Sequence, residues 1–532
     1  MITNIRILIL LLAVVAAAAV VASRLKIPAA ILLVLIGLAL SLAPGLPTMQ
    51  LAPEFVLLLV LPPVIYSSAF NMSWREFRFS LRPITLLSVG GVLFTAVAVA
   101  AAAHGLMGFD WRIGFLLGAI ISPPDAVAPL AIARGMEIPR RIVVILEGEG
   151  LANDAAALIL YRFAVAAVGA GGFSLGEATS IFAAIVAGEI IWGVGVGWLM
   201  LRLRRWVNEP LAEIVLSILT PFLAFWPPEH LGGSGVLATV TAGLYTSFNG
   251  PRLISSMTRL QGVFFWQFFM YVIEGMVFLI TGLQARTISS HIDEFPLSQL
   301  ALSIAVIAAV VIIARFLWVF PAAYLPRALF PPIRKYDPSP PWRWIFLLAF
   351  TGVRGIVSLA AALAIPLGTV AGKPFPDRDL ILLLTFALIL ITLVGQGLAL
   401  PWLIRVLGLS HAGRQERERD LVEEHKARSE AVKAAILSLD QLAAERKLSP
   451  DAIAIIRVLH EDRLTQIENR TGEDARQFSE LRDDLERQLI AIERARINEL
   501  YRAGELNDES RRRIERDLDM REAFLFNQRR NA

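Results

Sequence analysis

Long apolar segments alternate with short polar ones along the first 409 residues of the chain. Because a helix needs about 20 apolar residues to cross the hydrocarbon of a bilayer, this pattern predicts thirteen membrane-spanning helices. They cover residues 5–23, 28–43, 52–70, 84–104, 112–133, 142–168, 177–201, 211–227, 234–249, 262–285, 298–325, 344–366 and 379–407. The first is followed by a poor cleavage site for signal peptidase, so we interpret it as a retained helix.

The pattern changes after residue 409. Residues 410–532 hold 51 of the 96 Asp, Glu, Lys and Arg residues of the chain. Gly413, Pro450, Gly472 and Gly504 divide this part into four predicted helices, 414–447, 451–469, 474–502 and 507–528. Their charges mostly alternate in sign, which is typical of solvated helical faces, and no motif indicates a ligand or a partner. We therefore expect an all-α polytopic membrane protein with a membrane domain, 1–409, and a helical C-terminal domain, 410–532.

The basic residues of the loops predict the topology of the membrane domain. With the N-terminus outside, the inward loops hold seventeen Lys and Arg residues and the outward segments hold five. Such an excess on one side marks the cytoplasmic face. We expect a multi-pass protein of a bacterial plasma membrane with a cytoplasmic C-terminal domain. The inward residues are Arg24, Lys26, Arg75, Arg78, Arg82, Arg134, Arg140, Arg141, Arg202, Arg204, Arg205, Arg252, Arg259, Arg327, Arg334, Lys335 and Arg343, and the outward ones are Arg6, Arg112, Arg286, Lys373 and Arg378.

Composition narrows the class of protein. The mean hydropathy of +0.61 is too high for a soluble protein. Most of the excess base behind the net charge of +4 lies in short loops, so we expect no binding of nucleic acid. The absence of cysteine excludes disulfides and thiolate metal sites, and we expect no cofactor.

Two of the predicted helices, the fifth and the twelfth, are interrupted. The fifth contains Ser122-Pro123-Pro124-Asp125, and the twelfth contains Gly352-Val353-Arg354-Gly355. If helices 1–6 and 8–13 form two repeats, the breaks lie at matching positions of inverted six-helix units. Such crossing helices indicate a transport site near the membrane midplane. The alternative is that Pro and Gly are simply common in membrane helices.

The sixth helix carries three carboxylates, and an acid in the hydrocarbon costs at least about 2.5–3.5 kcal/mol. Glu147, Gly150 and Asp154 share one face by their helical spacing, and we expect Gly150 to leave space there for an ion or water. Glu149 and Asn153 form a neighbouring pair. Desolvation favours a protonated carboxyl and a bound cation favours the ionised form, so Asp154 can hold either a proton or a cation. This competition is sufficient for antiport.

Two arginines inside predicted helices can balance the charge of these acids. We pair Arg315 with Glu149, which leaves Asp154 as the exchanging acid. Arg354 takes the place of the mobile cations that the ends of a broken helix would otherwise attract. A static ion-pair network that holds the helices together remains an alternative for Glu149 and Arg315.

Glu189 and Glu274 are further intramembrane acids, and no helix break surrounds either of them. Each is either a contact in a cavity or an interface, or a second proton site. The sequence leaves both alternatives open.

Three motifs resemble those of the NhaP/NHE-type monovalent cation–proton antiporters, especially the bacterial sodium–proton members. Glu149-Gly150-Leu151-Ala152-Asn153-Asp154 is similar to a family Glu-Ser-Leu-x-Asn-Asp. Ser122-Pro123-Pro124-Asp125 is similar to Ser-Pro-Thr-Asp, and Gly352-Val353-Arg354-Gly355 to a Gly-(Leu/Val)-Arg-Gly element. The resemblance runs from about Arg24 to Leu409.

The resemblance implies a homodimer in which a core (84–168 and 298–407) moves against dimerisation helices (5–70 and 177–285) in an elevator-like cycle. It implies Asp154 as the carrier, with Na⁺ held at Asp154 and Asp125, a site shaped by Asp125 and Asn153, and a Glu149–Arg315 bridge. The Asn-Asp pair implies electroneutral one-for-one exchange, in the service of pH and sodium homeostasis.

Pro124 and Gly150 stand where the family often has hydroxyl side chains, and Tyr66-Ser67-Ser68 where some members have a Glu. More of the coordination would then come from water or backbone carbonyls, so Na⁺, Li⁺ and K⁺ all remain open. A K⁺/H⁺ antiporter and a cation channel on the same scaffold are alternatives. An intramembrane aspartyl enzyme using Asp125 and Asp154 would need two carboxylates that share a proton, but Asn153 adjoins Asp154. A structural or sensor protein would need no matched breaks.

Overall fold

The computed structural model describes residues 2–25, 27–43, 51–170, 175–207, 209–289, 296–368, 374–446, 449–468, 473–503 and 505–530. These residues form helices and no β-strand beyond an isolated bridge between Gly368 and Pro374. The chain divides into two compact units, Met1–Arg414 and Gln415–Ala532. Lys26 and Lys373, which belong to the predicted loop charges, lie outside the described residues.

Within the described residues, eight helical stretches are long and apolar enough to cross a membrane. They are Arg6–Leu25, Leu81–Met107, Arg140–Val168, Ser180–Val207, Pro210–His230, Ser256–Ser289, Leu297–Leu329 and Arg378–Val406. Each overlaps one predicted span. Shorter apolar helices, Ala29–Ser41, Phe55–Asn71 and Trp111–Ile121, overlap three more. The chain is a multi-pass membrane protein, and the count of thirteen spans stays a prediction.

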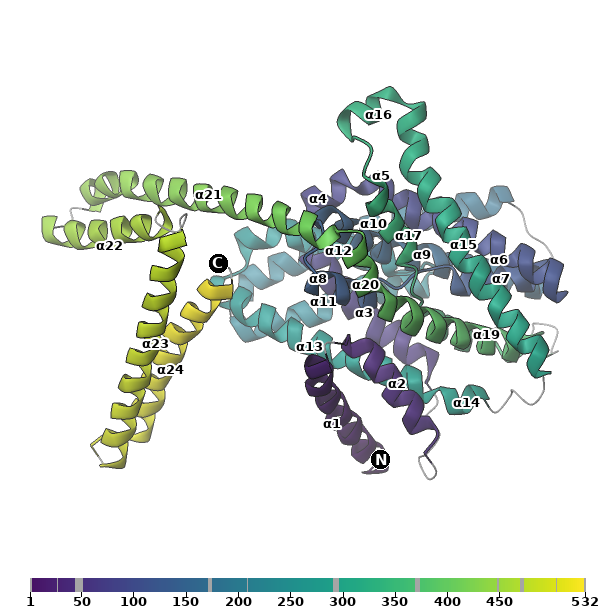
Figure 1. Ribbon diagram of the computed structural model, residues 1–532, viewed down its shortest axis with the longest axis horizontal. Helices are drawn as coiled ribbons and strands as arrows, with labels where there is room; N and C mark the ends of the chain where they lie inside the picture. The colour runs from purple at the N-terminus through teal and green to yellow at the C-terminus, as the bar shows by residue number, and fades with distance from the viewer. Residues whose placement is uncertain are drawn as a thin grey trace. The chain divides into compact units, whose positions relative to one another are not determined.

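The first group of helices, called here the first bundle, comes from residues 2–71 and 175–289. Its elements are α1 (Ile2–Leu25), α2 (Ala29–Ser41), the π-helical turn η1 (Phe55–Val60), α3 (Leu61–Asn71), α10 (Leu175–Val207), α11 (Pro210–His230), α12 (Val236–Leu253), α13 (Ser256–Leu283) and α14 (Ala285–Ser289). α13 packs against α1 and α2, and α12 packs against α3 and α10 (Figure 1). A Cβ at Gly282 would lie 2.2 Å from the carbonyl oxygen of Val34, so glycine allows α13 to approach α2 closely.

The second bundle comes from residues 74–170 and 297–406. Its elements are α4 (Trp74–Phe79), α5 (Leu81–Thr85), η2 (Leu86–Gly91), α6 (Val92–Met107), α7 (Trp111–Ile121), α8 (Val127–Gly135), α9 (Arg140–Ala170), α15 (Leu297–Leu329), α16 (Pro331–Tyr336), α17 (Trp342–Phe350), α18 (Ile356–Leu363), α19 (Arg378–Leu390), η4 (Ile391–Gln396) and α20 (Gly397–Val406). α6 packs against α7 and α15, and α7 also packs against α9. Gly118 allows the close contact of α7 with α6, since a Cβ there would lie 2.3 Å from the Ala96 carbonyl oxygen.

Both predicted helix breaks are present. Residues 122–126 are non-helical between α7 and α8, and residues 351–355 are non-helical between α17 and α18. Pro123 and Pro124 have no backbone N–H to continue α7. The two breaks contact each other, because the Asp125 N–H donates to the Val353 carbonyl at 2.6 Å. The two broken segments are far apart in the sequence but pack against each other.

Two predicted helix boundaries in the first bundle are wrong. α10 continues to Val207 rather than ending at residue 201. Arg204, expected in a loop, is buried in the last turn, where it donates hydrogen bonds to Thr220 Oγ1 at 3.1 Å and to the Tyr66 hydroxyl at 3.4 Å. α13 begins at Ser256 rather than at residue 262, because the Ser255 hydroxyl caps its first turn through the Thr258 N–H.

The second unit contains the four helices that the sequence predicts. They are α21 (Leu409–Arg446), which starts within the first unit, α22 (Pro450–Glu468), α23 (Glu473–Arg502) and α24 (Asp508–Arg530). α23 and α24 lie side by side (Figure 1), and Arg494 bridges Asp519 at 2.7 Å and Glu522 at 2.9 Å. The predicted division at Gly413 is wrong. Gly413 lies inside α21, where a Cβ would come 1.7 Å from the Glu137 carbonyl oxygen, so this glycine marks a close contact and not a helix start.

Candidate functional site

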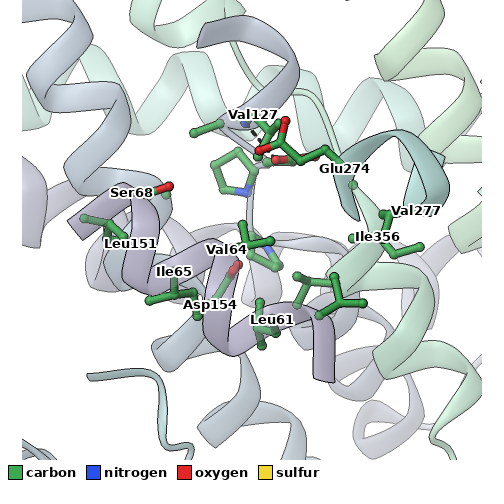
Figure 2. Close-up of a pocket in the computed structure, with 18 of the residues that line it drawn as sticks. Leu61, Val64, Ile65, Ser68, Val127, Leu151, Asp154, Glu274, Val277 and Ile356 are labelled. Atoms are coloured by element: carbon green, nitrogen blue, oxygen red, sulfur yellow. Dashed lines mark hydrogen bonds between the residues drawn. The ribbon is translucent and has the colours of Figure 1, made fainter. Parts of the chain in front are cut away.

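A cavity of about 110 Å³ lies between the two bundles. The first bundle supplies η1, α3 and α13, and the second supplies the break at 122–126, α8, α9 and the start of α18. Its polar lining consists of Asp125, Glu147, Asp154, Glu274, Ser68 and Ser358, and Figure 2 shows Asp154 and Glu274 among apolar side chains such as Leu61 and Val64. The described lining holds four carboxylates and no basic side chain. This volume is enough for several waters or a partly hydrated cation.

Asp154, Glu147 and Gly150 line the same cavity, as their helical spacing predicts. The role predicted for Gly150 is wrong, however. A Cβ at Gly150 would lie 2.7 Å from the Ala126 methyl carbon, so Gly150 lets α9 pack against the broken segment and leaves no free space of its own. The open volume comes instead from the gap between the bundles.

Asp125 lies where the two broken helices meet. Its Oδ1 accepts a hydrogen bond from the Val127 N–H at 2.9 Å, at the start of α8. Its Oδ2 faces Gly355, where a Cβ would lie 2.1 Å away, at the start of α18. The positive ends of two helix dipoles therefore stabilise this carboxylate, and only glycine fits at position 355.

Asn153 lies on the neighbouring face of α9 and is not among the described residues that line the cavity. It is fully buried, and its Nδ2 donates to the Pro124 carbonyl at 2.6 Å. Within the described part of the chain, its Oδ1 has no hydrogen-bond partner. Asn153 thus ties α9 to the broken segment that carries Asp125.

Glu149 and Arg315 form the predicted contact. Both are buried, and Arg315 donates from Nη1 to Oε1 at 2.6 Å and from Nη2 to Oε2 at 3.0 Å. Arg315 also donates to the Leu348 carbonyl from Nε at 3.2 Å and from Nη2 at 3.0 Å. This carbonyl belongs to the last turn of α17, so Arg315 also stabilises the negative end of a broken helix.

Arg354 has the same function at the other break. It is fully buried and donates from Nε to the Ile121 carbonyl at 2.9 Å and from Nη2 to the Ser122 carbonyl at 3.3 Å, at the end of α7. Its backbone N–H donates to Thr392 Oγ1 at 3.0 Å. The guanidinium occupies the position at which the carbonyl end of a broken helix would attract a mobile cation.

Glu189 and Glu274 lie in different environments. Glu189 caps the start of α12, accepting hydrogen bonds from the backbone N–H groups of Ser234 at 2.6 Å, Gly235 at 3.0 Å and Leu237 at 3.0 Å. Of the two alternatives for Glu189, this geometry favours the structural contact. Glu274 lines the cavity from α13 and keeps both alternatives.

Ser68 and Ser358 also line the cavity. The sequence marked Ser68 only as part of Tyr66-Ser67-Ser68, where some family members have a Glu, and did not single out Ser358. A hydroxyl inside an apolar helix is too common to be a signal. One feature does separate Ser358 from other serines: it follows the second broken segment by three residues, one helical turn after Gly355.

Among the described residues, no three His, Asp or Glu side chains come close enough together to hold a metal ion. A cation in this cavity would therefore need oxygen from water, hydroxyls or backbone as well as from carboxylates. A multi-pass helical protein with two helix breaks that contact each other beside such a cavity has the architecture of a secondary transporter rather than an enzyme.

Comparison with known proteins also indicates a transporter. The transmembrane sodium/hydrogen exchanger family matches residues 9–406, which include both breaks and the whole cavity lining. An uncharacterised Na⁺/H⁺ exchanger of Mycobacterium tuberculosis is 33% identical over 95% of this chain and 93% of its own length. The Na⁺/H⁺ antiporter NhaS2 of Synechocystis is 30% identical over 92% of this chain and 88% of its own. The chain therefore belongs to the sodium/hydrogen exchanger family and is a cation/proton antiporter.

Among solved structures, the sodium proton antiporter MjNhaP1 of Methanocaldococcus jannaschii matches with a TM-score of 0.61. The match covers 77% of this chain and 98% of that protein at 19% sequence identity. At this identity the likeness shows that the two chains share the fold.

Proposed function

We propose that the protein exchanges Na⁺ for H⁺, one for one, and that Asp154 carries each ion in turn. The observation that carries this proposal is the contrast among the acids of the site. Glu149 is paired with Arg315, and Asp125 is stabilised by two helix starts. Within the described residues, Asp154 has neither a hydrogen bond nor an ion pair, although it lines the cavity. It is the carboxylate whose charge the fold leaves for an ion to balance.

The stoichiometry follows from the same contrast. Asp154 crosses the membrane with either one proton or one monovalent cation, so both loaded forms have the same net charge. Asn153 cannot titrate, and Glu149 stays paired. The cycle then moves no net charge, and the membrane potential cannot drive it.

The Na⁺ would be held by Asp154 and Asp125, with water completing its coordination. The supporting observation is the shortage of side-chain oxygens around the cavity, where carboxylates and two serines are the polar groups of the described lining. The same shortage keeps a K⁺/H⁺ antiporter as the second candidate. A relative in Bacillus pumilus, 33% identical over 71% of this chain and 58% of its own length, is named a sodium, potassium, lithium and rubidium/H⁺ antiporter.

The position of the cavity supports alternating access. Asp125 and Asp154 belong to the second bundle, while the opposite wall, with Glu274, belongs to the first. We propose that the second bundle (core helices, 84–168 and 298–407) slides against the first (5–70 and 177–285), which forms a homodimer.

We further propose that the chain crosses the membrane thirteen times in two inverted repeats. It would lie in a bacterial plasma membrane with the N-terminus outside and serve pH and sodium homeostasis.

The test uses purified protein in liposomes with a pH-sensitive dye inside. Na⁺, Li⁺ and K⁺ are added in turn, and Na⁺ is expected to give the fastest cation-dependent proton flux. With Na⁺, the flux should be the same at inside-negative and inside-positive potentials set by valinomycin and K⁺. Acceleration by either potential would show that a second charge moves, with Glu274 the first suspect. Cation current without a pH gradient would indicate a channel.

A further inference from the structure

The cavity contains a buried hydroxyl with nothing to bond to. Ser358 lies in the first turn of α18 with 2% of its surface exposed, and it lines the cavity together with Asp125 and Asp154. Among the described residues, its Oγ has no hydrogen-bond partner. Leaving a buried polar group without a partner costs about 1–3 kcal/mol. A fold that keeps such a group in its ion cavity keeps it at a cost to stability.

The broken helix removes one acceptor that a helical hydroxyl can use. Ser and Thr in helices satisfy themselves by donating to a carbonyl three or four residues earlier. In this chain Thr246 donates to the Ala242 carbonyl, Thr281 to that of Val277 and Thr392 to that of Leu388, each at 2.8 Å. The corresponding carbonyls for Ser358 belong to residues 354 and 355, which are non-helical. The break removes the usual acceptor.

The same break places Ser358 beside the proposed ion site. Gly355, the last residue of the break, contacts the Asp125 carboxylate. Ser358 follows in the first turn of α18 and lines the same cavity as Asp125 and Asp154.

We propose that Ser358 Oγ is a ligand of the transported cation. The proposal rests on the exchange function proposed above and adds a coordinating residue to it. Hydroxyl oxygen is a hard donor of the kind that alkali and alkaline-earth cations prefer. Ser358 supplies a side-chain oxygen from α18. Pro124 in the first break and Gly150 on α9 have no side-chain oxygen to offer. Because the hydroxyl is neutral, it binds the cation without changing the charge that Asp154 carries.

The test compares Ser358→Ala with Ser88→Ala in liposomes. Ser88 is the matched control, because its hydroxyl is also buried and lacks a partner among the described residues, but it lies outside the cavity lining. For Ser358→Ala we expect the KM for Na⁺ to rise about tenfold, the effect of losing about 1.4 kcal/mol of binding, with little change in the maximal rate. The ratio of the KM values for Na⁺, Li⁺ and K⁺ should also change. Ser88→Ala should keep the wild-type values.

A second readout does not need transport. A ligand that binds the folded state raises the melting temperature by an amount set by the ratio of its concentration L to Kd, because the stabilisation is RT ln(1 + L/Kd). Ser358→Ala should need about ten times more Na⁺ than the wild type for the same rise, and Ser88→Ala should not. If Ser358→Ala fails to fold, Ser358→Cys, which has a soft sulfur of similar size, must show the same loss of Na⁺ binding.

The outcomes separate this proposal from the exchange function. If the wild type exchanges Na⁺ for H⁺ but Ser358→Ala and Ser358→Cys keep its KM values, the hydroxyl only holds water and the ligand assignment is wrong. If the wild type shows no cation-dependent proton flux but Na⁺ still stabilises it through Ser358, the exchange function is wrong and the binding site stands.

Discussion

The two faces of α9 carry the same kind of side chain in opposite situations. On one face Glu149 is bound to Arg315 through two hydrogen bonds, and Asn153 is bound to the Pro124 carbonyl. On the other face Asp154 borders a cavity and, within the described residues, has no hydrogen bond or ion pair. The acids are five residues apart. The proposed carrier is thus distinguished from the other acids inside the membrane by the partner that the fold does not give it.

The largest effect is expected on the cavity face. Asp154→Asn removes the charge and keeps the size, so the protein should fold but lose cation-dependent proton flux completely. The measurement is dye dequenching in liposomes, with size-exclusion elution and melting temperature as controls for folding. Exchange at the wild-type rate in this variant would remove the distinction between the two faces.

On the opposite face, the effect should be on stability first. Arg315→Ala leaves Glu149 buried and unpaired, and breaking a buried pair from one side costs roughly 3–5 kcal/mol. We expect a lower yield and a lower melting temperature as well as lost activity.

The double variant Arg315→Ala/Glu149→Ala sharpens this test. It leaves no unpaired charge and should be more stable than Arg315→Ala alone. If the double variant is the less stable of the two, the charge pairing is not what holds α9 to α15.

The smallest effect is expected at Glu189, a partnered acid in the first bundle. Glu189→Gln weakens the cap of α12 and should cost about 1–3 kcal/mol of stability, while transport per folded molecule stays unchanged and insensitive to membrane potential. Gly188→Ala is the control on the same helix, because a Cβ there meets no atom within 4 Å. A shift in the pH dependence of transport in Glu189→Gln would instead identify Glu189 as a second proton site.

The sequence predicted those features that depend on one helix or on charge balance. Pro123 and Pro124 predicted the first break because proline cannot continue a helix. The spacing of Glu147 and Asp154 predicted their shared face. The Glu149–Arg315 contact was predicted because two buried charges of opposite sign have few other ways to be stable.

Other features depend on packing between distant segments and could not be predicted. The Asp125 N–H reaches the Val353 carbonyl only because the two breaks pack against each other. Gly150 was expected to leave space for an ion, but Ala126 of the first broken segment fills the space beside it. Glu189 accepts a hydrogen bond from the backbone of Ser234, 45 residues later, just before α12 begins, and its position on α10 gives no sign of this contact. Ser358 could be recognised only once its missing acceptor was visible.

The contacts made by Arg315 and Arg354 also determine when, during biosynthesis, the candidate site is complete. Arg354 and the Ile121 carbonyl are 233 residues apart, and Glu149 and Arg315 are 166 apart. At about 5–20 residues per second of translation, the longer interval is roughly 10–50 s. Until Arg315 and Arg354 are synthesised, Glu149 and the carbonyl end of α7 lack these partners. The contacts of Arg315 and Arg354 therefore form late in assembly, and a chain truncated before Arg354 can contain most of the helices without the contact that joins the two breaks.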